Sequence, residues 1–148
     1  MIAANRSLAP LLAGASPDLL RPPVNVLRLS LHPDGLAPRI ANLAQWHAHV
    51  LERLRRQIEI STDPILAALH AELMAYPVPS DGSMPRRAKD DPGVVVPLRI
   101  QTEHGLLSFL TTTTIFGSPV DVTLAELAIE SFFPADAATA DVVRGLAE

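Results

Sequence analysis

The sequence contains no cysteine. Disulfides, thiolate nucleophiles, cysteine-ligated zinc sites and iron–sulfur clusters are therefore all excluded. Aromatic residues make up only 4% of the chain, so stacking platforms for nucleotides or flavins are scarce. The chain also shows no signal-peptide pattern and no apolar run long enough to span a membrane. These absences favour a cytoplasmic protein that needs no cofactor and has no membrane partner.

Catalytic and nucleotide-binding motifs are missing as well. The sequence has no G-x-S-x-G, G-x-G-x-x-G, P-loop or H-E-x-x-H pattern. His47 and His49 are two residues apart, so on a helix they point to different sides and cannot jointly hold a metal ion. No potential nucleophile has an identifiable base nearby in the sequence. We therefore expect neither an enzyme nor a metal site.

Hydrophobic residues account for 48% of the 148 positions and charged residues for 19%, which predicts one domain, residues 1–148, with a real core. The net charge of −4 argues against a DNA-binding surface, because such a surface needs clustered lysine and arginine. Two short basic runs are more readily interpreted as solvated surface than as DNA contacts. These runs are Arg53, Arg55 and Arg56, and Arg86, Arg87 and Lys89.

The first half of the chain is predicted to be helical, because apolar residues recur at spacings of three and four. Asn5 is placed to cap a first helix carrying Leu8, Leu11 and Leu12, and Gly14 to end it. A short helix over Val24–Leu31 should stop at His32-Pro33. The longest helix is expected from about Pro38 to Glu59, and another, capped by Asp63 with Pro64 in its first turn, should end before Pro77.

The second half is predicted to be a sheet. A polar, mobile loop over residues 76–93 should separate it from the helices, and alternating apolar residues begin at Val94. A hairpin turn at His104-Gly105 would pair Ile100 with Phe109. Further elements are a partner strand over 106–116, a third strand within 121–133 and a short helix over 136–146.

This order of elements predicts an α+β fold, an antiparallel sheet with helices packed on one face. The inner face of the hairpin would be apolar and interrupted by Thr111 and Thr113, while Asn25 and Arg28 share one side of their short helix. An apolar cup with a few polar groups is typical of a small-molecule pocket. The simpler alternative is that Arg28 extends to solvent and that the threonines merely favour strand structure.

Long segments of the chain resemble the ligand-binding domain of MmyB-like transcription regulators. They are residues 24–40 (VNVLRLSLHPDGLAPRI), 42–46 (NLAQW) with 51–57 (LERLRRQ), 111–127 (TTTTIFGSPVDVTLAEL) and 129–136 (IESFFPAD). The resemblance implies a PAS-like fold, a preceding helix-turn-helix domain of the XRE type and a fatty acid or similar lipid-like effector. Family members carry that DNA-binding domain and a complete first strand ahead of Ala3, whereas this chain starts at Met1. DNA binding is thus expected only through a helix-turn-helix domain that is absent from this chain.

Two hypotheses follow. The first is an effector-sensing domain of a bacterial transcription regulator, with a homodimer left open. Its expected ligand contacts are Asn25, Arg28, Trp46, Leu98, Ile100, Phe109, Thr111 and Thr113. The alternative is a dimerisation or protein-interaction module with a filled core and no ligand.

Overall fold

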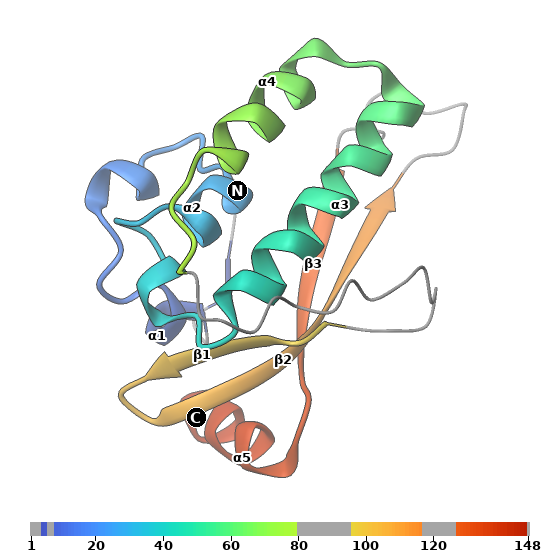
Figure 1. The fold of residues 1–148 in the computed structure, drawn as a ribbon. Helices are drawn as coiled ribbons and strands as arrows, with labels where there is room; N and C mark the ends of the chain where they lie inside the picture. Colours follow the sequence, from blue (N-terminus) through green and yellow to red (C-terminus); the bar gives the residue numbers. More distant parts are fainter. Residues whose placement is uncertain (1–3, 6–7, 80–95, 117–126, 148) are drawn as a thin grey trace.

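The helices and the sheet occupy separate halves of the chain in the computed structural model, which describes residues 4–5, 8–79, 96–116 and 127–147 (Figure 1). Among these described residues, helices make up the first half, and a three-stranded antiparallel sheet followed by one helix makes up the second. The α+β class predicted from the order of elements is confirmed.

The N-terminal region consists of short helical segments. These are α1 (Ala9–Leu12), the 3-10 helix η2 (Pro17–Leu20) and α2 (Val26–Leu31). The prediction that Asn5 caps the first helix is wrong, because the backbone C=O of Asn5 accepts the Leu8 N–H in a preceding turn. Gly14 has a φ of +79°, which agrees with its expected place just after the helix.

The two longest helices of the first half pack against each other as a hairpin. They are α3 (Leu43–Ser61) and α4 (Pro64–Met74), and Asp63 caps α4 as predicted, since its Oδ1 accepts the Ile65 N–H. The expected start of α3 at Pro38 is wrong. Residues Ala37–Arg39 form a separate 3-10 helix, η3, and Ile40 makes an isolated bridge to Ile100 in the sheet. Because this pairing keeps Ile40 extended, the helix begins only at Leu43.

The sheet has the order β1-β2-β3, and all pairings are antiparallel. Its strands are β1 (Leu98–Thr102), β2 (Gly105–Phe116) and β3 (Leu127–Pro134), and α5 (Ala137–Ala147) packs against β2 and β3. Of the predicted strand and loop regions, residues 80–95 and 117–126 lie outside the described part of the chain.

The hairpin register differs by two residues from the prediction. Leu98 lies opposite Phe109 and Thr102 opposite Gly105, so the turn consists of Glu103 and His104. The Thr102 side chain explains the earlier turn, because its Oγ1 accepts the His104 N–H and donates to the Gly105 C=O. A shift of two residues preserves which face each side chain occupies. The residues predicted for the inner face are therefore correct, although the predicted turn is wrong.

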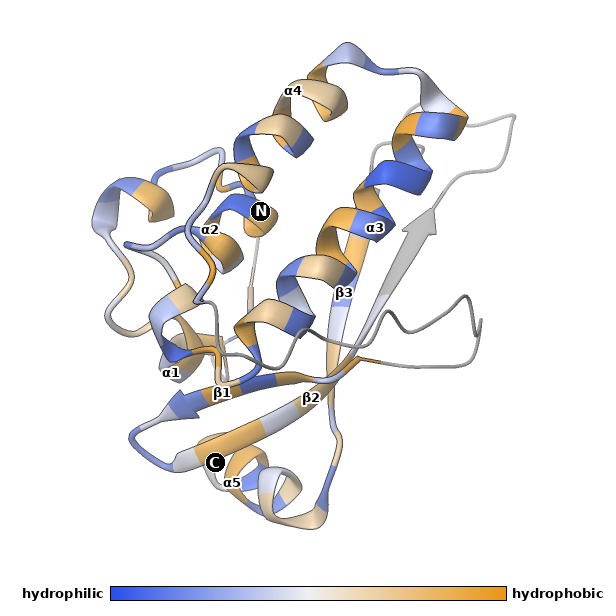
Figure 2. Cartoon of the chain, viewed as in Figure 1, coloured by the Kyte–Doolittle hydropathy of each residue, from blue (hydrophilic) through white to orange (hydrophobic). Residues whose placement is uncertain are grey.

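One apolar core joins the helices to the inner face of the sheet. Strand β1 alternates hydrophobic and hydrophilic residues (Figure 2), and Leu98 and Ile100 are buried while Arg99 and Gln101 are exposed. Helix α3 contributes Trp46, Val50 and Leu54 to the same core. On the outer face of β2, Leu106 and Leu110 stay exposed, which agrees with helices covering the inner face.

Candidate functional site

Four of the expected ligand contacts lie together in this core. Trp46 on α3 is 4% exposed, Leu98 4%, Ile100 0% and Phe109 3%, and all four belong to one packed cluster. Aliphatic side chains dominate the inner face of β1 and β2, as the sequence predicted. A molecule occupying this region would have to part α3 from the sheet, since these side chains are already packed together.

Side chains between α3 and the part of the sheet farther from the hairpin turn are more exposed to solvent. Here Leu51, Ile58, Thr111 and Phe132 are only half-buried, whereas Leu54 between them is 1% exposed. An ion pair spans this region, with Arg53 Nη2 on α3 lying 3.5 Å from Glu130 Oε1 on β3. Thr113 lies opposite Glu130 in the register, and its side chain lies outside the described part.

Asn25 holds a structural position at the start of α2. Its Oδ1 accepts the backbone N–H of Leu27 at 3.1 Å and that of Arg28 at 3.0 Å. This is an N-cap, which satisfies two of the amides that a helix leaves unpaired at its beginning. Only the amide nitrogen of Asn25 is left to serve as a donor to a ligand.

Arg28 reaches across from α2 to a carboxylate on α4. Its Nε donates to Glu72 Oε1 at 2.6 Å and its Nη2 to Glu72 Oε2 at 2.7 Å, a two-pronged contact. The Tyr76 hydroxyl donates to the same Oε1 at 2.5 Å. Arg28 thus pairs with an anion that belongs to the protein, while 41% of its side chain remains exposed to solvent.

Hydrogen bonding from Arg28, reinforced by Tyr76, lowers the pKa of Glu72 to about 2. Burial and the same carboxylate raise the pKa of Tyr76 to about 12. Because the Glu72 pKa is depressed from 4.5, its pairing stabilises the fold above that pH and is lost as the pH falls towards 2. The arginine, the carboxylate and the phenol therefore keep their charge states throughout the neutral range.

Glu72 and Tyr76 were not identified from the sequence. The contact joins residues 44 positions apart, a separation at which spacing rules on a single helix carry no information. One signal was available: Glu72 is the only carboxylate in the α4 segment Pro64–Met74, where every other residue except His70 is apolar. A lone charge in such a segment usually has a partner.

Further polar contacts tie α3 to its neighbours. The Trp46 Nε1–H donates to Ser30 Oγ on α2 at 2.9 Å, and His47 Nε2 lies 3.0 Å from the Leu73 C=O on α4. His47 is thus hydrogen-bonded within the helical layer, as expected for a histidine in an apolar stripe. Together with the pair of Arg28 and Glu72, these bonds connect α2, α3 and α4.

A surface hollow of about 460 Å³ lies away from the inner sheet face, beside the turn that follows α2. Arg39 borders it, and its guanidinium is bonded to the backbone C=O groups of Pro10 and Leu11. The donors of this guanidinium are therefore occupied by carbonyl groups at the C-terminal end of α1. The residues around the hollow are Gly14, Ser16, Pro33, Asp34, Gly35, Pro38 and Arg39.

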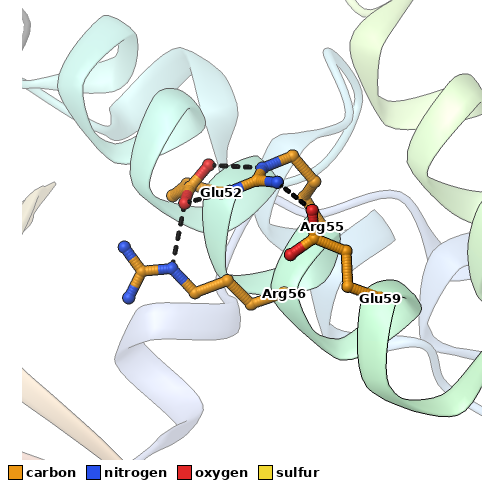
Figure 3. Close-up of polar contacts among 4 residues, drawn as sticks. All are labelled: Glu52, Arg55, Arg56 and Glu59. Carbon is orange, nitrogen blue, oxygen red and sulfur yellow. Dashed lines mark hydrogen bonds and ion pairs between the residues drawn. The ribbon is translucent and has the colours of Figure 1, made fainter. Parts of the chain in front are cut away.

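The basic run on α3 is matched by acidic residues (Figure 3). Glu52 accepts two hydrogen bonds from Arg55, both at 2.8 Å, and one from Arg56 at 2.9 Å, while Glu59 also accepts from Arg55. These arginines lower the pKa of Glu52 to about 2. The second basic run, Arg86, Arg87 and Lys89, lies outside the described residues. Paired charges of this kind on α3 are typical of a solvated helix face.

Within the described ranges, no three histidine, aspartate or glutamate side chains come together as a metal site. No helix among those same residues is long and apolar enough to cross a membrane.

A family model described as MmyB-like transcription regulator ligand binding domain matches residues 1–146. No curated protein and no solved structure gives a significant match. The matched region includes both the apolar inner face and the pair of Arg28 and Glu72.

Proposed function

The chain belongs to the family of MmyB-like transcription regulator ligand-binding domains, which is a regulator family and not an enzyme family. From that premise we propose that the chain is a cytoplasmic sensor of a fatty acid or similar lipid-like effector. We further propose a PAS-like arrangement, which the α+β order and the antiparallel sheet support. The single observation that carries the proposal is the aliphatic inner face of the sheet beneath α3.

That inner face suits an acyl chain better than a flat aromatic ligand. Leu98, Ile100 and Leu107 present aliphatic surface beside Phe109, and aromatic residues are only 4% of the chain. The half-buried side chains between α3 and β2–β3, including Thr111, offer the place where a chain could enter. Each buried methylene contributes roughly 0.8 kcal/mol, so chain length would dominate the affinity.

Arg28 is the proposed contact for the carboxylate of the effector, and Asn25 an additional donor beside it. Guanidinium binds carboxylates through two parallel hydrogen bonds, the geometry that it already makes with Glu72. An acidic head group would then compete with Glu72 for the same two N–H groups. That exchange would release the tie between α2 and α4.

Such a release would couple binding to regulation by shifting a population of conformations. In the structure, hydrogen bonds connect α2, α3 and α4. A ligand that parts α3 from the sheet and takes Arg28 from Glu72 favours another packing. An attached DNA-binding domain that senses the position of these helices would respond to the difference.

The direct test is native mass spectrometry of the purified chain. We expect a mass that exceeds that of the polypeptide by the mass of one fatty acid, and the bare polypeptide mass after denaturation. A purified chain without ligand should take up one molecule when incubated with tetradecanoic acid. A chain that stays bare after that incubation would contradict the proposal and favour a protein-interaction module with a filled core.

Regarding DNA, the chain itself should bind duplexes no better than nonspecifically. Its net charge is −4, and the arginines on α3 already have carboxylate partners. A gel-shift titration at physiological salt, with random duplexes as the control, measures this directly. Tight, sequence-selective binding would contradict the expectation.

A further inference from the structure

Helix α3 is tied to the sheet at its beginning by hydrogen bonds. Asn42, the residue before α3, donates from Nδ2 to the Pro97 C=O at 2.9 Å, and its Oδ1 accepts the Arg99 N–H at 3.1 Å. The neighbouring Ala41 N–H donates to the Arg99 C=O at 2.8 Å. These three hydrogen bonds fix the start of the helix beside β1.

Another polar contact joins α3 to the sheet farther along the helix. Arg53 Nη2 lies 3.5 Å from Glu130 Oε1 on β3, and a helix rise of 1.5 Å per residue places Arg53 roughly 16 Å beyond Asn42. The side chains of Arg53 and Glu130 are 33% and 22% exposed, so solvent screens their attraction less than at the surface. Glu130 is the one charged residue in the β3 sequence LAIESFFP, and a partly buried carboxylate needs such a partner.

The histidine one turn earlier on α3 adds no positive charge at neutral pH. Burial lowers the pKa of His49, and the charges of Arg53 and Arg56 lower it further. Arg56 is itself paired with Glu52, at 2.9 Å. Arg53 is therefore the cation that α3 directs to the carboxylate on β3.

Apolar surface lies along α3 between these two contacts. Val50 is 2% and Leu54 1% exposed, and both belong to the core cluster. On the facing sheet, Phe132 and Thr111 are paired in the register of β3 and β2 and are half-buried. Lifting the helix near Arg53 would expose this apolar surface, while the start of the helix stays in place.

We propose that the ion pair of Arg53 and Glu130 is a latch, which holds α3 on the sheet and sets how often the apolar region beneath the helix opens to the effector. Helix α3 pivots about its fixed start at Asn42 when the pair separates. The contact suits this role because it is longer, at 3.5 Å, than the two-pronged pair of Arg28 and Glu72 at 2.6 and 2.7 Å. The latch rests on the proposed function and adds a means of its regulation.

A latch of this kind opposes binding. Where only the open packing accepts a ligand, the apparent Kd is the intrinsic Kd divided by the open fraction. Removing a partly buried ion pair raises that fraction about fivefold. The effect is equal for an acid and for an alcohol, because the latch resists the opening itself and contacts no head group.

The binding test uses decanoic acid and decanol in calorimetric titrations. Glu130→Gln removes the charge and keeps the size of the side chain, and we expect both ligands to bind about fivefold more tightly; Arg53→Gln should have the same effect. The double variant Arg53→Glu with Glu130→Arg restores the pair and should return both affinities to those of the wild type. Glu59→Gln is the matched control, because it removes an ion pair with Arg55 on the exposed side of the same helix. Circular dichroism confirms that each variant is folded.

The direction of these changes separates a latch from direct roles in head-group binding. If Arg53 bound the carboxylate of the effector, Arg53→Gln would weaken binding of the acid. If Glu130 repelled that carboxylate, Glu130→Gln would tighten binding of the acid and leave the alcohol unchanged. Either result would overturn the proposal.

Opening of the helix is also measurable without an effector. The natural chain has no cysteine, so Thr111→Cys places a single thiol at a half-buried position on the inner face of β2. Its reaction with a maleimide should be about fivefold faster when Glu130→Gln is added, and it should return to the original rate in the charge-swapped chain. Thr112→Cys is the matched control, because Thr112 is already exposed and its thiol should react equally in all three chains.

The two measurements distinguish failure of the latch from failure of the proposed function. Equal labelling of Thr111→Cys in all three chains would overturn the latch, whether or not decanoic acid binds. Faster labelling in a chain that takes up no decanoic acid would support the latch and contradict the proposed function.

Discussion

The substitution Gly35→Ala is expected to lower the free energy of unfolding by roughly 2–4 kcal/mol. Gly35 is buried in the turn after α2, and a Cβ atom added there would lie 2.2 Å from the Leu29 carbonyl oxygen. That oxygen belongs to rigid backbone and accepts the Leu36 N–H at 2.9 Å. The alanine can fit only if α2 moves away from the turn and this hydrogen bond lengthens.

Urea unfolding can be followed by the fluorescence of Trp46, which is the single tryptophan of the chain and is 4% exposed. Gly145→Ala is the matched control. In α5 an added Cβ would meet nothing within 4 Å, so the variant should gain about 0.5–1 kcal/mol from better helix propensity. An unfolding midpoint for Gly35→Ala equal to that of the wild type would contradict this prediction, because the turn would then accommodate the added methyl group without a loss of stability.

Local patterns in the sequence were sufficient to predict most helices and the buried face of the hairpin. Asp63 with Pro64 fixed the start of α4, and the alternation of Leu98 and Ile100 identified the buried face before the register was known. The errors arose where distant residues intervene. Ile40 is held extended by a bridge to Ile100, an interaction that the local sequence of the expected helix does not reveal.

The same distinction applies to the candidate site. The apolar contacts followed from periodicity, and the structure brings Trp46, Leu98 and Phe109 together. Arg28 was recognised as a cation in apolar surroundings, but its partner Glu72 lies on another helix and could not be paired with it by spacing. Asn25 is a predicted ligand contact because it shares a side with Arg28, and the structure adds that its oxygen caps the helix. This capping role could not be separated from ligand binding by residue spacing alone.

Calorimetric titration with saturated fatty acids should show affinity rising steeply with chain length, from octanoic to tetradecanoic acid. Two added methylenes contribute about 1.6 kcal/mol, which corresponds to roughly fifteenfold tighter binding per step. The gain in affinity per added methylene measures burial of the acyl chain between α3 and the sheet, since all the acids share the same head group. A flat series would contradict the acyl-chain pocket, whatever the role of Arg28.

The head group is tested by comparing each acid with the alcohol of equal length. Arg28→Ala should abolish the preference for the acid while leaving the length slope intact, because it removes the guanidinium and none of the apolar contacts. Glu72→Gln should have the opposite effect and strengthen acid binding about tenfold, since it removes the anion that competes for Arg28. Arg21→Ala is the control, because that arginine is exposed and pairs with Asp18 on the surface.

The two variants together separate the head-group role of Arg28 from a purely structural one. If Arg28 only ties α2 to α4, then Arg28→Ala and Glu72→Gln both break the tie and should change ligand affinity in the same direction. If Arg28 binds the effector, they should change it in opposite directions. At neutral pH the comparison is not disturbed by titration, because the pKa of Glu72 is about 2 and the carboxylate stays ionised. Opposite signs are the expected result, and equal signs would assign the carboxylate of the effector to another residue.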